Sequence, residues 1–426
     1  MPSSIPTAAA PLRLPAPLRR GALLRFPAPV SERLDLIRGV AALVVMWNHL
    51  RAALFVEYPA VQAAHAGLAA RLVYFATGFG HAAVVVFFVL SGLLISASVL
   101  RAVEEGRWSW GWYASQRLTR LYVVLVPTLV LGALWDRGGL KLFGADGVYT
   151  GEPGASFMGF AVMDRIGAGT AAANAFFLQE ITAPPFGSNA PLWSLSYEFW
   201  YYVLFPALLL AALPGRPVRR AACLVAAAAV ALLVGPVIRV YFLIWLLGVA
   251  VAVAPAPLAS RPRLRRAVLA VLTAGLAALL VAVRVDAFSS ALLSDSALGV
   301  CFAALVWTLV QSGSTREAGA RPPAYARAGS TVAAFSFTLY LAHMPLVIFL
   351  AAVLTRNGAA RWQPDTLHLA LLVPLTLLVL AYAWALAQVT EARTVQVRHW
   401  VERQARALMA RSTEPALRAR SGPAAR

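Results

Sequence analysis

Long apolar runs recur along the chain, separated by short connections that contain arginine or proline. Many of these runs approach or exceed the roughly 20 residues that an α-helix needs to cross a bilayer. Pro236 separates two runs that would otherwise be continuous, so the count depends on whether this proline divides them. The pattern predicts an all-α, polytopic transmembrane helical bundle of about ten spans, at residues 34–57, 79–100, 121–135, 192–213, 221–235, 237–254, 267–285, 288–311, 332–354 and 366–389.

Composition also indicates a membrane protein, because 60% of the residues are hydrophobic and only 13% are charged. Soluble domains carry roughly one-quarter charged residues. The net charge of +19 is divided into small clusters between the apolar runs, which argues against nucleic acid as a partner. Cys223 and Cys301 each lie inside an apolar run without CxxC or histidine-rich spacing, so we predict neither a disulfide framework nor a metal site.

The distribution of arginine predicts the orientation, because Lys and Arg accumulate in short cytoplasmic loops. An inside start places four clusters on the inner side: Arg101, Arg107, Arg117 and Arg120; Arg216, Arg219 and Arg220; Arg261, Arg263, Arg265 and Arg266; and Arg316, Arg321 and Arg327. The outer connections hold scattered charges without a comparable cluster. An even number of spans then leaves both termini in the cytoplasm.

Three regions are expected. Residues 1–31, rich in Pro, Ala and Arg, are interpreted as a flexible cytoplasmic tail, residues 32–392 as the membrane domain, and residues 393–426 as a basic cytoplasmic tail. The first part of the second tail is expected to form a helix on the membrane surface. The longest connection, 136–191, is placed outside; its apolar stretch at 171–178 is interpreted as a re-entrant or interfacial helix, with a disordered loop as the alternative.

Ionisable groups inside apolar spans are costly in hydrocarbon and are therefore the first candidates for a site. Arg38 and His49 are eleven residues apart, which leaves them roughly 20° apart around a helix and about 16 Å apart along it. Both side chains can therefore line one vertical groove. A buried histidine could act as a general base or carry an acyl group. Alternatively, His49 forms a structural hydrogen bond between helices and Arg38 anchors the helix at the interface.

Three further positions carry candidate chemistry. Arg117 and Arg120 form an i,i+3 pair whose guanidinium groups suit phosphate, although arginines that only set orientation give the same pattern. Glu198 lies in an aromatic stretch and could orient a polar acceptor or pair with a buried His or Arg, or be an ordinary charge at the outer interface. His343 precedes Pro345 and could act in catalysis or in a bond that bends the helix. The small residues around Gly92 suggest close helix packing.

Taken in order, these motifs resemble the acyltransferase-3 family of integral membrane acyltransferases. The motifs are Leu-Asp-x-x-Arg-Gly with Arg-x10-His from Arg38 to His49, Phe-Phe-x-x-Ser-Gly at 87–92, Arg-x-x-Arg at 117–120, Leu-Trp-Ser-Leu-Ser-x-Glu at 192–198 and Tyr-Leu-x-His-x-Pro at 340–345. They span nearly all of the chain outside the tails. Leu36, Phe199 and Ala342 depart from residues common in the family, and Phe199 makes a second carboxylate role doubtful.

The resemblance implies a transferase in a bacterial cytoplasmic (inner) membrane that moves an acyl group, usually acetyl, from cytoplasmic acyl-CoA to a hydroxyl of an extracytoplasmic or lipid-linked saccharide. It implies Arg38, Arg117 and Arg120 as donor-binding residues and His49 as the central catalytic residue, with Arg38, Glu198 and His343 assisting. Acetyl-CoA or another acyl-CoA would be a substrate, so no permanently bound cofactor is expected. The patterns give no oligomeric state.

Two other classes of protein are alternatives. A solute transporter would also have about ten spans and buried ionisable groups, but no inverted repeat is evident. A membrane glycosyltransferase would need a carboxylate-rich metal site, and no such cluster appears in the sequence.

Overall fold

The computed structural model describes residues 13–65, 67–144, 146–152, 154–312 and 321–420. It is 77% helical and has no strand within these ranges. The helices are α1 (Ala16–Leu23), α2 (Ala28–Leu54), α3 (Tyr58–Ala63), α4 (Leu68–Ala76), α5 (Gly80–Glu104), α6 (Trp110–Phe143), α7 (Ala168–Ala175), α8 (Trp193–Ala212), α9 (Pro217–Leu233), α10 (Gly235–Val253), α11 (Pro262–Arg284), α12 (Ala291–Val310), α13 (Ala324–Ala333), α14 (Ser336–Leu354), α15 (Thr366–Val389) and α16 (Thr394–Arg420), with short 3₁₀ turns η1 (Gly147–Tyr149), η2 (Met163–Arg165), η3 (Ala190–Leu192) and η4 (Glu391–Arg393).

Eight helices in the described part of the chain are long and apolar enough to cross a membrane, which confirms the all-α polytopic class. Two of the eight include a neighbouring helix, because Leu68–Glu104 joins α4 to α5 and Thr366–Ala407 joins α15 to the start of α16. The other two predicted spans fall on α2, with 27 residues, and α9, with 17.

Asp365 is the N-cap residue of α15. The backbone N–H of His368 donates to its carboxylate, and this hydrogen bond lowers the pKa of Asp365.

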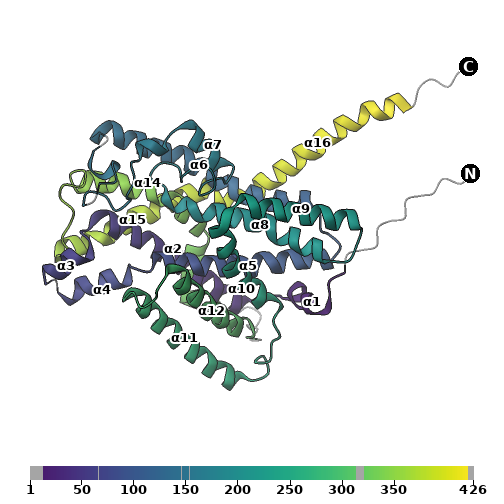
Figure 1. Cartoon of the computed structure of the whole chain (residues 1–426), viewed down its shortest axis with the longest axis horizontal. Helices are drawn as coiled ribbons and strands as arrows, with labels where there is room; N and C mark the ends of the chain where they lie inside the picture. The colour runs from purple at the N-terminus through teal and green to yellow at the C-terminus, as the bar shows by residue number, and fades with distance from the viewer. Residues whose placement is uncertain (1–12, 66, 145, 153, 313–320, 421–426) are drawn as a thin grey trace, which may run out of the picture.

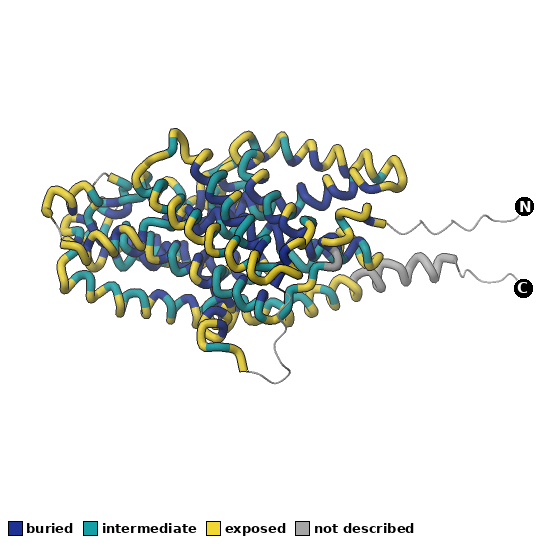
Figure 2. Tube along the Cα trace, turned by 90° about the horizontal axis from the view of Figure 1, so that it is seen from below, coloured by how far each residue is buried: buried dark blue, intermediate teal, exposed yellow. Residues whose placement is uncertain are grey.

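Glycine brings α5 and α10 into backbone contact at the centre of the bundle. A Cβ atom at Gly92 would lie 2.0 Å from the carbonyl oxygen of Trp245, and one at Gly248 would lie 2.1 Å from that of Val89. No larger residue fits either position without separating the helices. The predicted close packing around Gly92 is therefore confirmed, and the buried residues continue through the centre of the bundle (Figure 2).

The chain segments near the two termini lie at the same end of the bundle, opposite α3 and α4 (Figure 1). α16 packs alongside α6. There Ser115 donates to Glu402 at 3.2 Å, and Arg398 donates to Gln116 at 2.5 Å. Arg101 at the end of α5 donates to the carbonyl of Leu24 at 2.6 Å. The terminal segments and the first predicted inner loop are therefore adjacent.

The expectation of a flexible tail over residues 1–31 needs correction from residue 13 onward. Leu14 is 2% exposed, and its backbone N–H donates to Glu104 at 3.3 Å. Arg19 pairs with the same carboxylate at 3.4 Å, and α1 packs against α5 and α10. Apolar contacts and a shared carboxylate thus hold this segment on the bundle. Residues 1–12, Arg316 and residues 421–426 lie outside the described residues.

The long connection after α6 is folded against the bundle. It contains the helix α7, which confirms a helix at the predicted apolar stretch, and the disordered alternative is wrong for its described residues. Asp136 accepts from the backbone and hydroxyl of Ser188 at 2.8 and 2.6 Å, and Asn189 donates to the carbonyl of Leu341 at 2.7 Å. Because Ser188 and Asn189 are both buried, the end of this connection forms part of the interior beside α14.

Candidate active site

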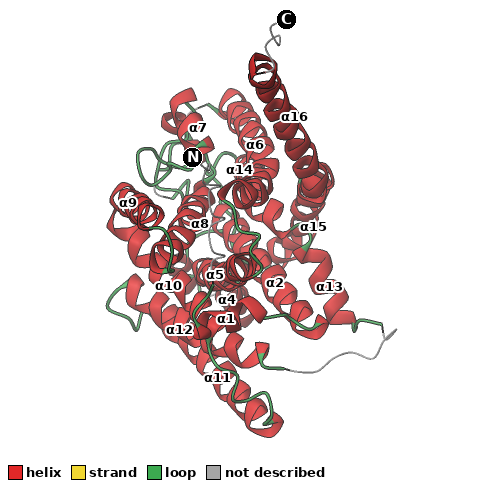
Figure 3. Cartoon of the chain, turned by 90° about the vertical axis from the view of Figure 1, so that its right-hand side faces the viewer, coloured by secondary structure: helices red, strands yellow, loops and turns green. Residues whose placement is uncertain are grey.

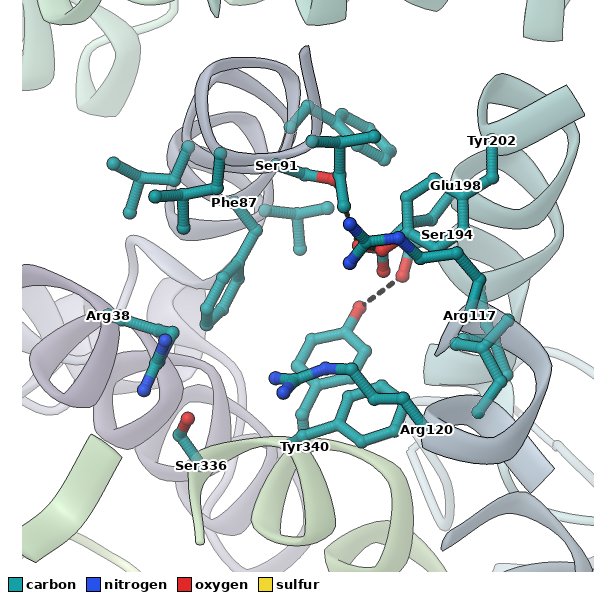
Figure 4. A pocket seen from close by; sticks show the side chains of 18 residues that line it. Arg38, Phe87, Ser91, Arg117, Arg120, Ser194, Glu198, Tyr202, Ser336 and Tyr340 are labelled. Carbon is teal, nitrogen blue, oxygen red and sulfur yellow. Dashed lines mark hydrogen bonds between the residues drawn. The ribbon is translucent and has the colours of Figure 1, made fainter. Parts of the chain in front are cut away.

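Three arginines face one cavity of about 230 Å³ between α2, α5, α6, α8 and α14. Arg38 lies on α2, across the cavity from Arg117 and Arg120 on α6 (Figure 4). The three residues predicted to bind the donor therefore meet in space, although Arg38 is far from the other two in sequence. Such a concentration of guanidinium groups favours an anionic ligand.

Arg38 is held by groups at the end of the cavity nearest α13. It pairs with Asp35 at 3.1 Å and donates to the carbonyl of Ala333 at 3.2 Å. Its Nε atom is buried without a hydrogen-bond partner. Arg38 also interacts electrostatically with Arg120 and Glu391. The carboxyl group of Glu391 accepts from the backbone N–H and the hydroxyl of Thr338 at 3.0 and 3.1 Å, which fix it near Arg38 and Arg120.

The helical spacing of Arg117 and Arg120 points both side chains toward the cavity. Arg117 donates to Ser98 at 3.1 Å, lies over the rings of Tyr113 and Tyr202, and keeps a buried Nε without a partner. Arg120 is more exposed and lies 5.8 Å from the ring centroid of Phe337. The first guanidinium is thus fixed by packing, and the second lies nearer to solvent.

Glu198 lines the arginine cavity from α8. Its carboxylate accepts from Ser91 at 3.0 Å and from Tyr202 one helical turn along. The structure therefore places Glu198 in the same cavity as the predicted donor-binding residues, beside Arg117 (Figure 4). Of the sequence-based interpretations, a position near a buried arginine agrees with this arrangement. In this position the carboxylate offsets part of the positive charge and limits which anion the cavity accepts.

His49 and His343 form a pair between α2 and α14. His49 Nδ1 lies 2.8 Å from His343 Nε2, and the rings stack with centroids 5.1 Å apart. His343 is fully buried, and its Nδ1 lies 2.7 Å from the carbonyl oxygen of Leu339. A carbonyl can only accept, so His343 Nδ1 carries the hydrogen and Nε2 is the acceptor in the neutral ring.

This chain of hydrogen bonds determines the tautomer of His49. Because His343 Nε2 accepts, His49 Nδ1 must donate, and His49 Nε2 is left with a free lone pair. The arrangement matches a base oriented by a third group. His49 is only partly buried, and Phe157 of the long connection stacks beside it at a centroid distance of 6.3 Å. The basic nitrogen therefore belongs to the more accessible ring of the pair.

The histidine pair and the arginine cavity are neighbouring parts of the same two helices. Arg38 precedes His49 on the uninterrupted α2, and Tyr340 precedes His343 by one turn on α14. Tyr340 lines the cavity and its hydroxyl lies 2.7 Å from that of Ser194. The structure thus divides the predicted site residues into Arg38, Arg117, Arg120 and Glu198 in the cavity and His49 with His343 beyond it.

Several polar groups of this site have no role that the sequence patterns predicted, although Ser91, Ser194 and Tyr340 stand within the motifs. Tyr202 and Ser91 orient Glu198, Tyr340 and Ser194 form a buried pair, and Glu391 lies behind the arginines. Tyr202 could have been found from its i,i+4 spacing to Glu198. Glu391 follows the last predicted span, and no local pattern connects it with α2 or α6.

Comparison with known proteins agrees with this geometry. The family model for the acyltransferase-3 "Acyltransferase domain" matches residues 31–387. This chain belongs to the acyltransferase-3 family. No curated protein and no solved structure matches the chain. It is therefore a membrane acyltransferase. Family membership favours this class over a solute transporter or a glycosyltransferase.

Proposed function

We propose that this acyltransferase-3 protein transfers an acyl group, in the first instance acetyl, from cytoplasmic acyl-CoA to a hydroxyl of an extracytoplasmic saccharide. The observation that carries the proposal is the coupling of a three-arginine cavity to an oriented histidine pair along α2 and α14. Coenzyme A is an anionic donor with three phosphate groups, and its pantetheine arm is long and thin. A cavity of about 230 Å³ admits only part of it, so the adenosine end stays at the mouth beside Arg120 while the thioester extends toward His49.

The chemical step follows from the tautomer of His49. His49 Nε2 takes the proton of the acceptor hydroxyl as that oxygen attacks the thioester carbonyl carbon. The new C–O bond forms, the C–S bond breaks, and the thiolate of coenzyme A leaves and recovers the proton from the imidazolium. His343 accepts from His49 Nδ1 throughout and stabilises the positive ring. A relay through an acyl group on His49 Nε2 uses the same lone pair.

The test of this proposal is a His49→Ala variant of the full chain in detergent or vesicles. Acyl transfer from acetyl-CoA should fall by about 10²- to 10⁴-fold, the usual contribution of a general base, with expression and donor binding retained. Substantial remaining transfer would remove His49 from this role. On the parent protein, rapid denaturation at neutral pH after mixing with radiolabelled acetyl-CoA distinguishes the two routes. Protein-bound label that is absent from His49→Ala marks an acyl group carried by His49.

A further inference from the structure

A second cavity lies on the other side of α2 from the histidine pair. It is a groove of about 410 Å³ between α2, α5, α11 and α12, and its lining is almost entirely aliphatic and aromatic. Each of these four helices forms one wall, which includes Val44 on α2, Val86 on α5, Leu280 on α11 and Phe302 on α12. α11 has no buried residue and lies at the edge of the bundle beside α12 (Figure 3). The groove is therefore open to the hydrocarbon of the membrane.

Positive charge is concentrated at the end of this groove farthest from α1 and α16. Along α11, Arg284 follows Leu276 and Leu280 at four-residue steps, so the apolar wall leads directly to a guanidinium group. Along α2, Arg51 lies seven residues after Val44 and shares its face. The two arginines are close enough to interact electrostatically.

The turn before α5 holds both arginines in place. Arg51 Nε donates to the hydroxyl of Thr77 at 3.2 Å. The guanidinium of Arg284 lies over the Cα of Gly78, where a Cβ atom would be 2.8 Å from its Cζ, and its Nε is buried without a hydrogen-bond partner. Phe79, the next residue, lines the groove. The charged end and the apolar groove are therefore parts of one surface.

Asp295, an acidic group one turn before the groove residue Leu298 on α12, is already engaged in hydrogen bonds. Asp295 is 1% exposed and accepts from His81 at 2.7 Å and from Tyr241 at 2.5 Å. Two donors on one carboxylate oxygen reduce its repulsion of an approaching anion. The exposed side of this cluster is His81, whose side chain is 54% exposed and stacks on Trp193.

We propose that this groove binds the hydrocarbon tail of a lipid-phosphate-linked acceptor, with the phosphate between Arg51 and Arg284. An aliphatic channel that ends in two arginines is complementary to an amphiphile with an anionic head and to neither a plain hydrocarbon nor a free sugar. Arg51 follows His49 by two residues near the end of α2, so a saccharide attached to this phosphate would extend over the end of α2 toward the catalytic ring. This inference rests on the proposed function, because it identifies the class of acceptor.

The probe is farnesyl phosphate, a short isoprenoid phosphate, added to the full chain in detergent and measured by native mass spectrometry. Farnesol lacks the phosphate and inorganic phosphate lacks the tail. We expect farnesyl phosphate to bind at least about tenfold more tightly than either one, since each omits one half of the complementary surface. Equal binding of farnesol, or equal binding of inorganic phosphate, would overturn the proposal.

Two matched pairs of variants locate the site. Leu280→Trp fills the groove, whereas Val281→Trp places the same side chain on the exposed face of α11. Arg284→Gln removes charge at the groove, whereas Arg239→Gln removes an exposed arginine at the start of α10. Leu280→Trp and Arg284→Gln should each weaken farnesyl phosphate binding about tenfold or more. Val281→Trp and Arg239→Gln should leave it unchanged. Equal effects within both pairs would contradict the assignment.

Failure of this inference is distinguishable from failure of the proposed function. Acyl transfer to a soluble saccharide that depends on His49, without farnesyl phosphate binding, would refute the groove and leave the transferase intact. Farnesyl phosphate binding that depends on Leu280, without acyl transfer, would do the reverse.

Discussion

At the scale of single residues, the arrangement of proton donors and acceptors determines the chemistry of the site. The carbonyl of Leu339 fixes the hydrogen on His343, and His343 in turn fixes the tautomer of His49. In the proposed mechanism, His343 is a positioning residue, because it is buried and would act on the acceptor only through His49. In the same proposal, Arg38, Arg117 and Arg120 recognise the charge of the donor and take no part in proton transfer.

Replacing His343 tests this positioning role. In His343→Ala, the N–H at His49 Nδ1 loses its acceptor, and we expect kcat to fall by about 10²-fold with donor affinity unchanged. His343→Gln supplies an amide oxygen that can accept the same hydrogen and should restore part of the rate. Steady-state kinetics with acetyl-CoA measures both values. Equal loss in the Ala and Gln variants would argue against an orienting hydrogen bond.

Removing the two arginines of α6 tests donor recognition. Hydrogen bonds to charged groups contribute about 1.5–3 kcal/mol each, so Arg117→Ala/Arg120→Ala should weaken acyl-CoA binding by at least about tenfold. Lys at both positions keeps the charge but loses the planar fork, and an intermediate affinity is expected. Isothermal titration with coenzyme A provides the measurement.

The matched control for this pair is Arg216→Ala/Arg220→Ala. It removes two arginines from another predicted inner connection without changing the cavity. Coenzyme A affinity equal to that of the parent in the Arg117/Arg120 variant would return these residues to signals of membrane orientation.

At the scale of helices, close approach of α5 and α10 holds together the helices that carry the cavity wall. α5 supplies Ser91, and α10 supplies Trp245, whose indole N–H donates to the same serine at 3.2 Å. This hydrogen bond depends on Gly92 and Gly248, which allow the backbones of α5 and α10 to touch. Packing at these glycines therefore positions the group that orients Glu198.

Enlarging Gly248 should separate these helices. A side chain at this position meets the carbonyl of Val89, and overpacking of this kind costs about 1–3 kcal/mol or more. We expect Gly248→Leu to lower the thermal unfolding midpoint in detergent and to reduce transfer. Ala250→Leu introduces the same side chain on the exposed face of α10 and should change neither quantity. An unfolding midpoint for Gly248→Leu equal to that of Ala250→Leu would show that the helices can move apart without cost.

At the scale of the whole molecule, the arrangement of helices agrees with a protein that works from two sides of a membrane. α1, α16 and the first arginine-rich connection lie together at one end, and α3 and α4 lie at the other. The arginine cavity contains residues of the first end, whereas Phe157 of the long connection reaches His49 from the opposite direction. In the proposed function, the donor and the acceptor approach His49 from these two directions.

The orientation is tested with reporter fusions. Fusions at both termini and in the Arg107 connection should report the cytoplasm, and a fusion in the 136–191 connection should report the outside, because arginine clusters are retained on the inner side. A fusion at Gly154 avoids the buried end of that connection. An external C-terminus would overturn the topology and the two-sided mechanism with it.

The sequence by itself determined the features that depend on neighbouring residues. Helical periodicity and length predicted the membrane class, placed Arg38 and His49 on one helix, and paired Arg117 with Arg120. These features are local because each helical hydrogen bond joins residues four positions apart. The motif order pointed to the family that the comparison then showed.

Only the tertiary structure decided which distant groups meet. His49 and His343 are 294 residues apart in the chain, Glu198 shares a cavity with the arginines, and α1 packs against the bundle instead of extending as a tail. The sequence shows Arg51 and Arg284 as two isolated arginines, so their proximity at the end of the groove could not be predicted from it. The physical reason is that contacts between helices depend on which faces pack together, and a single sequence records the face of each helix but not its neighbour.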